Sequence, residues 1–363
     1  MVTVSLCMIV KNEEAVLSRC LTSVKGIADE IIIVDTGSTD ATKEIAMSFG
    51  AKVYDFPWID DFSAARNFSF SNATMQYILW LDADDVLQAE EREKLLKLKE
   101  TLDEGVDAVM MRYDIAFDSG GRPSFSYFRE RLSKRARNFK WEEPVHEFLR
   151  TYGNIVNAEI HVTHQKPKRE SEPGRNARIY EAILQRGETL SPRGTYYYAR
   201  ELKDMGRFIE AAERFCEFLA SRKGWVEDNI AACLGLARCL AATGDEDGAL
   251  KALFQSFLYD APRAEVCCEI GYRFKAKTDY RRAAFWFSLV EHLERPADSW
   301  GFFELDSWNY VPFLECAVCY DRLGELEKAE YFNELAAAAK TDSHAVAHNR
   351  AYFASKKETR NRS

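Results

Sequence analysis

An acidic run directly after a short apolar segment is the first place where this chain could bind a metal ion. Residues 77–81 have the apolar pattern of a buried strand, and Asp82, Ala83, Asp84 and Asp85 follow it. Carboxylates two positions apart at a strand end can converge on one hard cation, Mg²⁺ or Mn²⁺, with a diphosphate completing its coordination. The letters alone are weak evidence, because acidic residues also favour the starts of helices.

A second acidic residue ends another predicted strand. Asp35 follows residues 31–34. In an open α/β sheet, ligands bind beside the carboxyl ends of the strands, so both acidic groups would face the same crevice. The sequence contains neither a glycine-rich dinucleotide fingerprint after a strand nor a P-loop, so neither a nicotinamide site nor a P-loop site is expected.

The first half of the chain alternates strand and helix patterns. Strands are expected at residues 2–10, 31–34, 52–54, 77–81 and 108–113. Helices are expected after Asn12, which could cap the first of them, from Thr39 or Asp40 to Gly50, and over residues 63–73 and 90–102. This alternation favours an α/β domain with a parallel sheet and helices on both faces.

The second half is rich in alanine, leucine and aromatic residues and contains an internal repeat. A turn residue is followed by an alanine five positions later at Gly206, Gly244, Thr278 and Gly324. A period near 34 residues with this pattern resembles tetratricopeptide repeats, which stack pairs of helices and form surfaces that hold other chains. An unrelated helical bundle is the alternative.

Composition agrees with two soluble domains. The chain has 363 residues, which at about 150 residues per domain predicts two. The net charge of −9, without a basic block, argues against nucleic acid as the main partner. Nine scattered cysteines fit reduced thiols and a cytoplasmic location, and no apolar run is long enough for a membrane span. We expect domains at 1–170 and 171–355, joined by a polar linker at 165–174, and a polar tail at 356–363.

Three motifs occur in order and carry a family resemblance. They are residues 5–14 (SLCMIVKNEE), 32–40 (IIVDTGSTD) and 79–85 (LWLDADD), supported by 60–67 (DDFSAARN) and 145–147 (VHE). Together they resemble a family 2 glycosyltransferase with the GT-A fold, a Rossmann-like nucleotide-sugar-binding domain. With a following all-α tetratricopeptide-like domain, the chain is similar to the subgroup of sublancin-type S-glycosyltransferases, which glycosylate a cysteine of a bacteriocin.

The resemblance implies a site for a UDP-sugar and a divalent metal. Asp84 would hold Mg²⁺ or Mn²⁺, and either His146 or His164 would add a metal ligand or diphosphate contact. The implied nucleotide-sugar contacts are Val10, Asn12, Glu13, Asp35, Thr36, Asp40, Arg66, Asp82 and Ala83. Simpler roles compete with these: Asp35 could form a turn, Asp40 could cap a helix, and a lone histidine is more often a structural hydrogen-bonding group.

Inverting sugar transfer also needs a base for the acceptor proton. The candidates are Glu142, Glu143 and Glu147, of which we favour Glu147, and Asp85 is a second catalytic candidate. The basic stretch 129–140 could be a lid over the diphosphate, with Arg131 as its main contact, or simply a solvated loop.

These features predict a metal-dependent inverting transferase that moves a hexose from a UDP-glucose-like donor to Cys or Ser/Thr of a peptide or protein. The helical repeats would hold that acceptor, and a homodimer remains open. One alternative is a polysaccharide or lipid-linked acceptor. The other is a tetratricopeptide scaffold whose transferase domain is vestigial.

Overall fold

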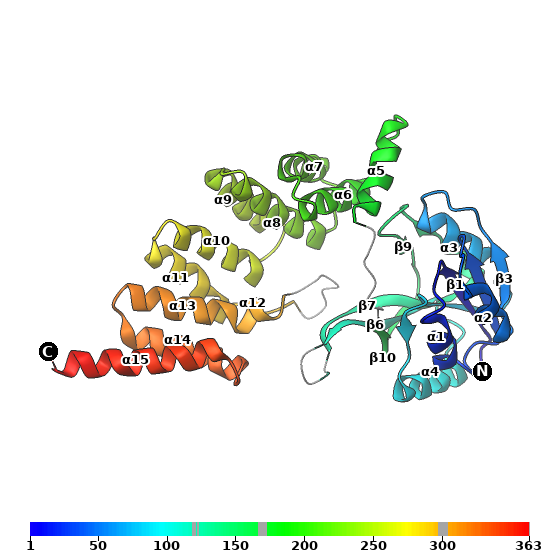
Figure 1. Ribbon diagram of the computed structural model, residues 1–363, viewed down its shortest axis with the longest axis horizontal. Helices are drawn as coiled ribbons and strands as arrows, with labels where there is room; N and C mark the ends of the chain where they lie inside the picture. The colour runs from blue at the N-terminus through cyan, green and yellow to red at the C-terminus, as the bar shows by residue number, and fades with distance from the viewer. Residues whose placement is uncertain (118–120, 122, 166–172, 297–303, 363) are drawn as a thin grey trace. The chain divides into compact units, whose positions relative to one another are not determined.

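A computed structural model describes residues 1–117, 121, 123–165, 173–296 and 304–362. The chain forms two compact units, Met1–Thr189 and Leu190–Ser363 (Figure 1). Most of the predicted linker, and part of the longer connection that precedes the last repeat, lie outside the described residues. Each unit is therefore treated by itself.

An eight-stranded mixed sheet forms the centre of the first unit. Its order is β3 (Lys52–Asp55), β2 (Glu30–Asp35), β1 (Val4–Val10), β4 (Tyr77–Trp80), β7 (Pro123–Lys134), β6 (Ala108–Phe117), β10 (Ile155–His164) and β5 (Asp85–Val86). The first four strands are parallel, as predicted. Beyond them the sheet is mixed rather than parallel as expected, because β7 runs antiparallel between β4 and β6, and β5 pairs antiparallel with β10.

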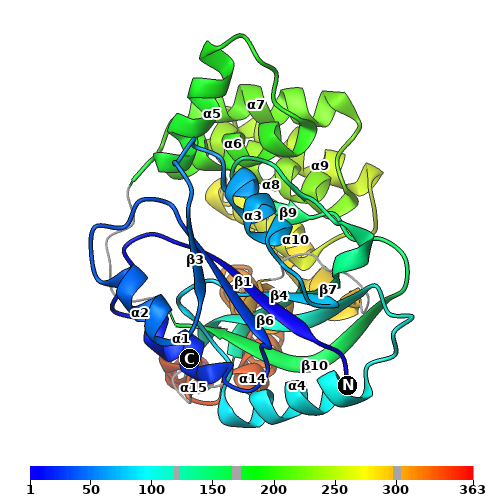
Figure 2. The ribbon, with the colours of Figure 1, turned by 90° about the vertical axis from the view of Figure 1, so that its right-hand side faces the viewer.

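Helices cover both faces of this sheet, as the alternating pattern predicts. On one face, α1 (Leu17–Ser23), α2 (Thr42–Ser48) and α4 (Ala89–Thr101) pack against apolar residues of the strands. On the other face lie α3 (Phe62–Ser71) and the small hairpin of β8 (Trp141–Glu142) and β9 (Phe148–Leu149), where Trp80 and Trp141 form a second core. Figure 2 shows β1, β4 and β6 between α3 and α4.

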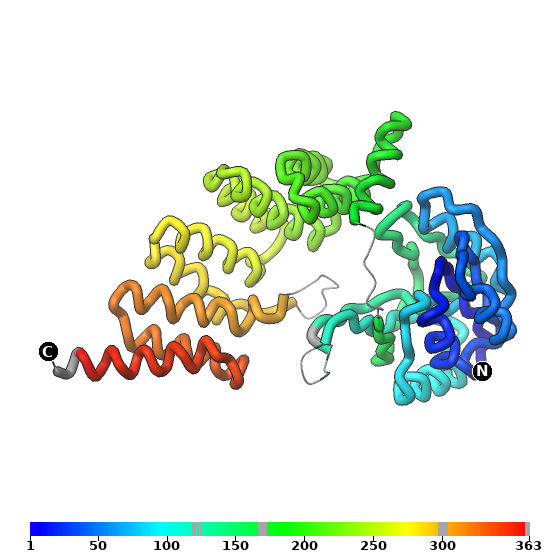
Figure 3. The backbone as a smooth tube through the Cα atoms, in the orientation of Figure 1, coloured from blue at the N-terminus to red at the C-terminus, as the bar shows by residue number. Residues whose placement is uncertain are grey.

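The second unit is a series of antiparallel helix pairs, visible as successive hairpins of the tube in Figure 3. The pairs are α6 (Pro192–Asp204) with α7 (Phe208–Ser221), α8 (Val226–Ala242) with α9 (Glu246–Gln255), α10 (Ala264–Ala276) with α11 (Tyr280–Leu289), and α13 (Val311–Arg322) with α14 (Leu326–Ala339). A short helix α12 (Asp306–Asn309) precedes the last pair, and α15 (His344–Arg362) ends the unit.

The predicted repeat positions have the expected structural roles. Gly206, Gly244, Thr278 and Gly324 lie between the two helices of a pair and all have positive φ, from 58° to 89°. The alanines five positions later, Ala211, Ala249, Ala283 and Ala329, are all 0% exposed. A small side chain there lets the helices of a pair approach closely, which confirms the tetratricopeptide-like interpretation.

The element boundaries differ from the expected domain limits in two places. The helix α5 (Arg175–Gln185), expected in the helical domain, belongs to the first compact unit. Residues 356–362, expected to be a tail, continue α15, since Lys, Glu and Arg favour a helix as well as a solvated coil. All nine cysteines are unpaired in the structure. Among the helices of the described residues, none has the length and apolar character needed to cross a membrane.

Candidate active site

A cleft of about 1030 Å³ opens in the first unit beside the carboxyl ends of β1, β2 and β4. Its wall contains many of the residues named from the sequence: Val10, Glu13, Thr36, Arg66, Asp82, Ala83, Asp84, His146, Glu147 and His164. The crevice expected from strand order is therefore present. In the part of the chain that the structure describes, Asn12, Asp35, Asp40, Asp85 and Arg131 are not among the lining residues.

Asp35 is fully buried where β2 ends, next to the cleft. Its Oδ1 accepts hydrogen bonds from the backbone N–H groups of Gly37 and Ser38 at 2.9 and 2.8 Å, so the turn considered as its simpler role is present. Its Oδ2 is buried without a hydrogen-bond partner. Because a buried polar atom without a partner is costly, this oxygen is a candidate acceptor for a ligand N–H or O–H.

Asn12 and Asp40 hold the two loops after β1 and β2 in place. The N–H of Thr39 donates to Asn12 Oδ1 at 2.8 Å, and Asn12 has a φ of 55°. The expectation that Asn12 caps the following helix was wrong, because α1 begins only at Leu17. Asp40 accepts from the backbone N–H of Thr42 at 3.0 Å, at the start of α2. Both residues shape the cleft from outside its wall.

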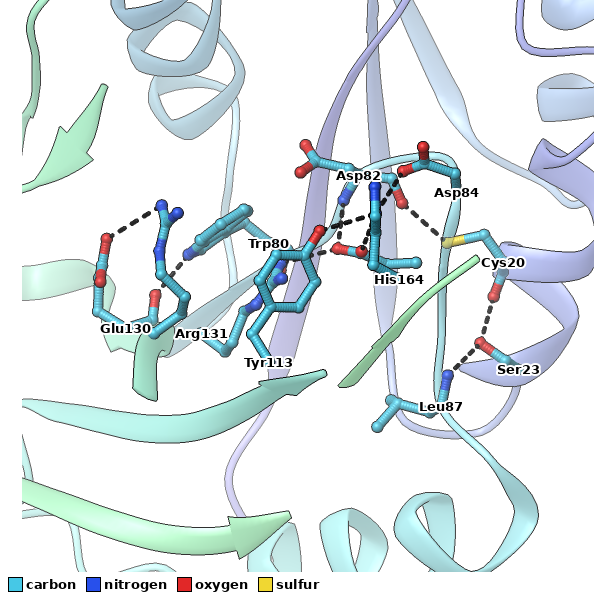
Figure 4. A network of polar contacts seen from close by, with 12 residues as sticks. Cys20, Ser23, Trp80, Asp82, Asp84, Leu87, Tyr113, Glu130, Arg131 and His164 are labelled. Carbon is cyan, nitrogen blue, oxygen red and sulfur yellow. Dashed lines mark hydrogen bonds and ion pairs between the residues drawn. The ribbon is translucent and has the colours of Figure 1, made fainter. Parts of the chain in front are cut away.

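Hydrogen bonds between its own residues stabilise the acidic turn after β4 (Figure 4). The N–H of Asp82 donates to Asp85 Oδ2 at 3.0 Å, and the N–H of Asp85 returns to the carbonyl of Asp82 at 3.0 Å. This arrangement places Asp82 and Asp84 in the cleft wall, whereas Asp85 is 0% exposed. Of the two catalytic candidates, Asp85 thus lies beneath the cleft and Glu147 lies in it.

Helix α1 supports the acidic turn from behind. The thiol of Cys20 donates to the carbonyl of Asp82 at 3.5 Å, and the hydroxyl of Ser23 donates to the carbonyl of Cys20 at 2.7 Å. The N–H of Leu87 in turn donates to Ser23 Oγ at 3.2 Å. Both ends of the turn are therefore tied to the same helix, as Figure 4 shows.

Asp84, Asp85 and His164 form a cluster suited to a divalent cation. One ligand atom of each lies within 4.8 Å of the others. His164 Nδ1 is 3.4 Å from Asp84 Oδ1 and 3.6 Å from Asp85 Oδ1, and hydrogen bonds to these carboxylates raise the pKa of His164 to about 9. Within the described residues His146 is not part of this cluster, although it lines the cleft. Carboxylate oxygens with one imidazole fit Mn²⁺ or Mg²⁺.

Arg66 joins the two sides of the cleft. Its NH2 is 2.8 Å from Asp82 Oδ1, and its Nε is 2.8 Å from Glu147 Oε1. The guanidinium lies 4.9 Å from the ring of Trp80 and 4.7 Å from that of Trp141. Although burial alone would raise it, the charges of the nearby arginines lower the pKa of Asp82 to about 2. Arg66, expected to contact the nucleotide-sugar, is bound to two carboxylates of the chain itself.

The prediction of a basic lid with Arg131 was wrong. Most of the stretch completes β7 and the short 3-10 helix after it, and the Arg131 side chain is 0% exposed. Its NH1 is 2.9 Å from Asp85 Oδ2, and its guanidinium lies between the rings of Trp80 (3.9 Å) and Tyr113 (4.3 Å). The arginine of this strand that lines the cleft is Arg129, whose guanidinium lies 4.9 Å from the Trp80 ring.

A further part of the cleft wall was missed from the sequence. The rings of Trp58 and Phe62 lie 4.7 Å apart, and the guanidinium of Arg175 from α5 lies 4.8 Å from the Phe62 ring. Asp60 has a φ of 58° and accepts a hydrogen bond from Trp58 Nε1 at 2.8 Å. Left-handed backbone at a residue with a side chain is uncommon and concentrates at functional sites. The only available signal was the DDFSAARN motif, which begins at Asp60.

Comparison with known proteins agrees with the motifs. Residues 5–153 match the family model for glycosyl transferase family 2. This part of the chain is a glycosyl transferase family 2 domain. The matched segment contains the acidic turn, Arg66 and Glu147, and it ends before His164 on β10.

Two curated proteins and one solved structure are similar to parts of the chain. A TPR repeat-containing protein of Synechococcus elongatus is 42% identical over 154 residues, which are 41% of this chain and 36% of that protein. The SPbeta prophage-derived glycosyltransferase SunS of Bacillus subtilis is 28% identical over 266 residues, 62% of this chain and 60% of SunS. The chain thus spans less than two thirds of the length of these relatives. A crystal structure of glucosyl-3-phosphoglycerate synthase from Mycobacterium tuberculosis with Mn²⁺ and UDP-glucose is 18% identical, covers 52% of this chain and 81% of that one, and has a TM-score of 0.36.

Proposed function

We propose that the chain is a metal-dependent, inverting glycosyltransferase that moves a hexose from a UDP-glucose-like donor to a side chain of a peptide or protein. The observation that carries the proposal is the cluster of Asp84 and His164 in the wall of a cleft within a family 2 domain. The relative named glycosyltransferase SunS supports the reaction class.

The donor would lie along the carboxyl ends of β1, β2 and β4. Val10 and Thr36 line this part of the cleft, and the unpaired Oδ2 of Asp35 is the acceptor that a nucleobase N–H or a ribose hydroxyl would satisfy. Asp82, held by Arg66 with a lowered pKa, stays ionised and fixed beside the donor sugar. Asn12 and Asp40 contribute by holding the loops rather than by lining the cleft.

Asp84 and His164 would hold the divalent cation, with Asp85 next to both. A cation bound there supplies Lewis-acid stabilisation of the negative charge that develops on the leaving diphosphate. The chain's own contribution is to fix the carboxylate and imidazole, through the turn bonds of Asp85 and the ties to α1.

Glu147 is the group proposed to accept the proton of the acceptor. It lines the cleft, and its Oε1 is fixed by Arg66, whereas Glu142 pairs with Arg150 at 2.7 Å in the small hairpin. A cysteine acceptor would need less help from this base than serine, because the thiol pKa is about 8.5. We propose that the aromatic wall of Trp58 and Phe62 contacts the acceptor and that the helical repeats hold the rest of the peptide.

Release of UDP from UDP-glucose, measured with Mn²⁺, tests this proposal. We expect Asp84→Asn to reduce the rate at least about 100-fold, because it removes a charged cation ligand. The matched control is Glu104→Gln, which changes an exposed carboxylate in the turn after α4 and should leave the rate within about twofold of wild type. Equal rates for Asp84→Asn and wild type, or metal-independent release, would contradict the proposal.

A further inference from the structure

His164 is held at one of its two ring nitrogens. Its Nδ1 is 2.9 Å from the hydroxyl oxygen of Tyr113 and 3.6 Å from Asp85 Oδ1, with Asp84 Oδ1 at 3.4 Å. The rings of Tyr113 and His164 meet edge to face with centroids 5.6 Å apart. Figure 4 shows the tyrosine hydroxyl and the acidic turn meeting at the imidazole. These three polar contacts of His164 therefore all involve Nδ1.

Tyr113 and Asp85, which lie next to Nδ1, both contact the buried side chain of Arg131. Arg131 is 0% exposed and packs its guanidinium 4.3 Å from the Tyr113 ring. The same guanidinium binds Asp85 Oδ2 at 2.9 Å. Asp85 Oδ1 is buried and lies 3.6 Å from His164 Nδ1. One buried arginine thus positions both neighbours of His164.

We propose that Tyr113 is the positioning residue of His164: with Asp85, it holds Nδ1 so that Nε2 is the nitrogen offered to a divalent cation. Histidines that bind metals characteristically hydrogen-bond through the other ring nitrogen, which fixes the tautomer and the ring orientation. Tyr113 contributes a hydroxyl that is tied to a buried ring, so the imidazole cannot rotate without losing that bond. The role of the cation in this inference rests on the proposed function, whereas the orientation of the imidazole ring does not.

Binding of Mn²⁺ to the full chain, measured by calorimetry without nucleotide, tests the proposal. Tyr113→Phe removes only the hydroxyl, and we expect it to weaken Mn²⁺ binding about tenfold, the effect typical of losing an orienting partner. The matched control is Tyr77→Phe, which removes another buried hydroxyl, bonded to the carbonyl of Val106 at 2.7 Å, and should change binding less than about twofold. Equal binding by the two variants would overturn the proposal.

The tautomer of His164 gives a readout that needs no metal. In ¹⁵N spectra of histidine-labelled chain at about pH 10, where the ring is neutral, we expect the tautomer with the proton on Nδ1. Tyr113→Phe should change the signals of His164, and Tyr77→Phe should leave them unchanged. Signals unaffected by Tyr113→Phe, or a proton on Nε2 in wild type, would overturn the positioning role. Absence of Mn²⁺ binding in wild type would instead count against the proposed function.

Discussion

The two units of this chain differ in what they bury. The first unit encloses ionised side chains around its cleft, among them Asp85 and Arg131 at 0% exposure and Arg66 at 7%. The second unit buries mainly small and apolar residues at its helix contacts, such as Ala249 and Cys316, both at 0% exposure. Its charged residues are mostly paired at the surface, although Arg263 and Glu265 are buried exceptions.

This difference distinguishes buried residues that stabilise the fold by packing from buried residues that position a functional site. Burying a charge costs free energy that pairing does not always recover, so an apolar core is the less costly solution for stability alone. The repeats adopt that solution, with alanine where helices meet and ion pairs such as Arg238 with Glu269 outside. The charges around the cleft are better explained by the geometry that they impose on Asp82, Asp84 and His164.

Removing the buried arginine of the cleft should have the largest effect. Arg66→Met leaves Asp82 and Glu147 without their shared cation between two tryptophan rings, and we expect a loss of about 3–5 kcal/mol in unfolding free energy from urea denaturation. Release of UDP should fall at least about 100-fold. Arg238→Met in the second unit, which breaks a half-exposed pair, should cost at most about 1 kcal/mol. Similar losses for the two variants would remove the distinction between the units.

A buried carboxylate away from the cleft should give a smaller, pH-dependent effect. Glu30 accepts from Ser5 and is 2.7 Å from Lys52; burial alone would raise its pKa, but these bonds lower it to about 2. A lowered pKa stabilises the folded state above the unfolded value near 4.5, and this contribution is lost as the pH falls towards 2. We expect Glu30→Gln to cost about 2 kcal/mol at neutral pH, with the gap to wild type narrowing below about pH 4.5.

The control for this prediction lies in the repeats. Glu334 pairs with Arg350 on the surface, and Glu334→Gln should cost less than about 0.5 kcal/mol. Urea denaturation of both variants between pH 2.5 and 7 would measure the two gaps. A gap for Glu30→Gln that does not change with pH would show that its carboxylate charge contributes nothing to stability.

The smallest effect should come from the backbone of the repeats. Thr278 has a φ of 58° at a turn position where the other pairs have glycine, and a β-branched residue is strained there. We expect Thr278→Gly to stabilise the chain by about 0.5–1 kcal/mol, since relief of strain exceeds the added flexibility of the unfolded chain. The reverse change, Gly324→Thr, should destabilise it by about 1–2 kcal/mol. Thermal unfolding of both variants measures this, and a less stable Thr278→Gly would contradict it.

The sequence was sufficient wherever a local pattern determines the structure. The turn Asp82–Asp85 follows a four-residue apolar strand, and its position at a strand end already predicts that Asp82 and Asp84 face the cleft. The repeat turns were equally predictable, because the turn residue and the alanine five positions later belong to the same helix pair. Long-range pairing plays little part in either feature.

The sequence was insufficient where a residue's surroundings come from distant strands. The basic stretch around Arg131 has the composition of a solvated loop, and its burial depends on β7 pairing with β4 at Leu79 and Leu132 and with β6 at Val109. That register places Arg131 over Trp80 and against Asp85, which no local pattern reveals. The contribution of Arg175 to the cleft was missed for the same reason, because α5 follows the first domain's motifs in the sequence.

The attachment of the acidic turn to α1 makes one thiol a reporter of the site. Cys20 is 0% exposed, burial raises the pKa of its thiol, and its hydrogen bond ends on the carbonyl of Asp82. A buried thiol with a raised pKa is inert towards alkylating reagents. Modification of Cys20 therefore requires that the helix and the turn separate, so its labelling rate measures how often the proposed cation site opens in the resting molecule.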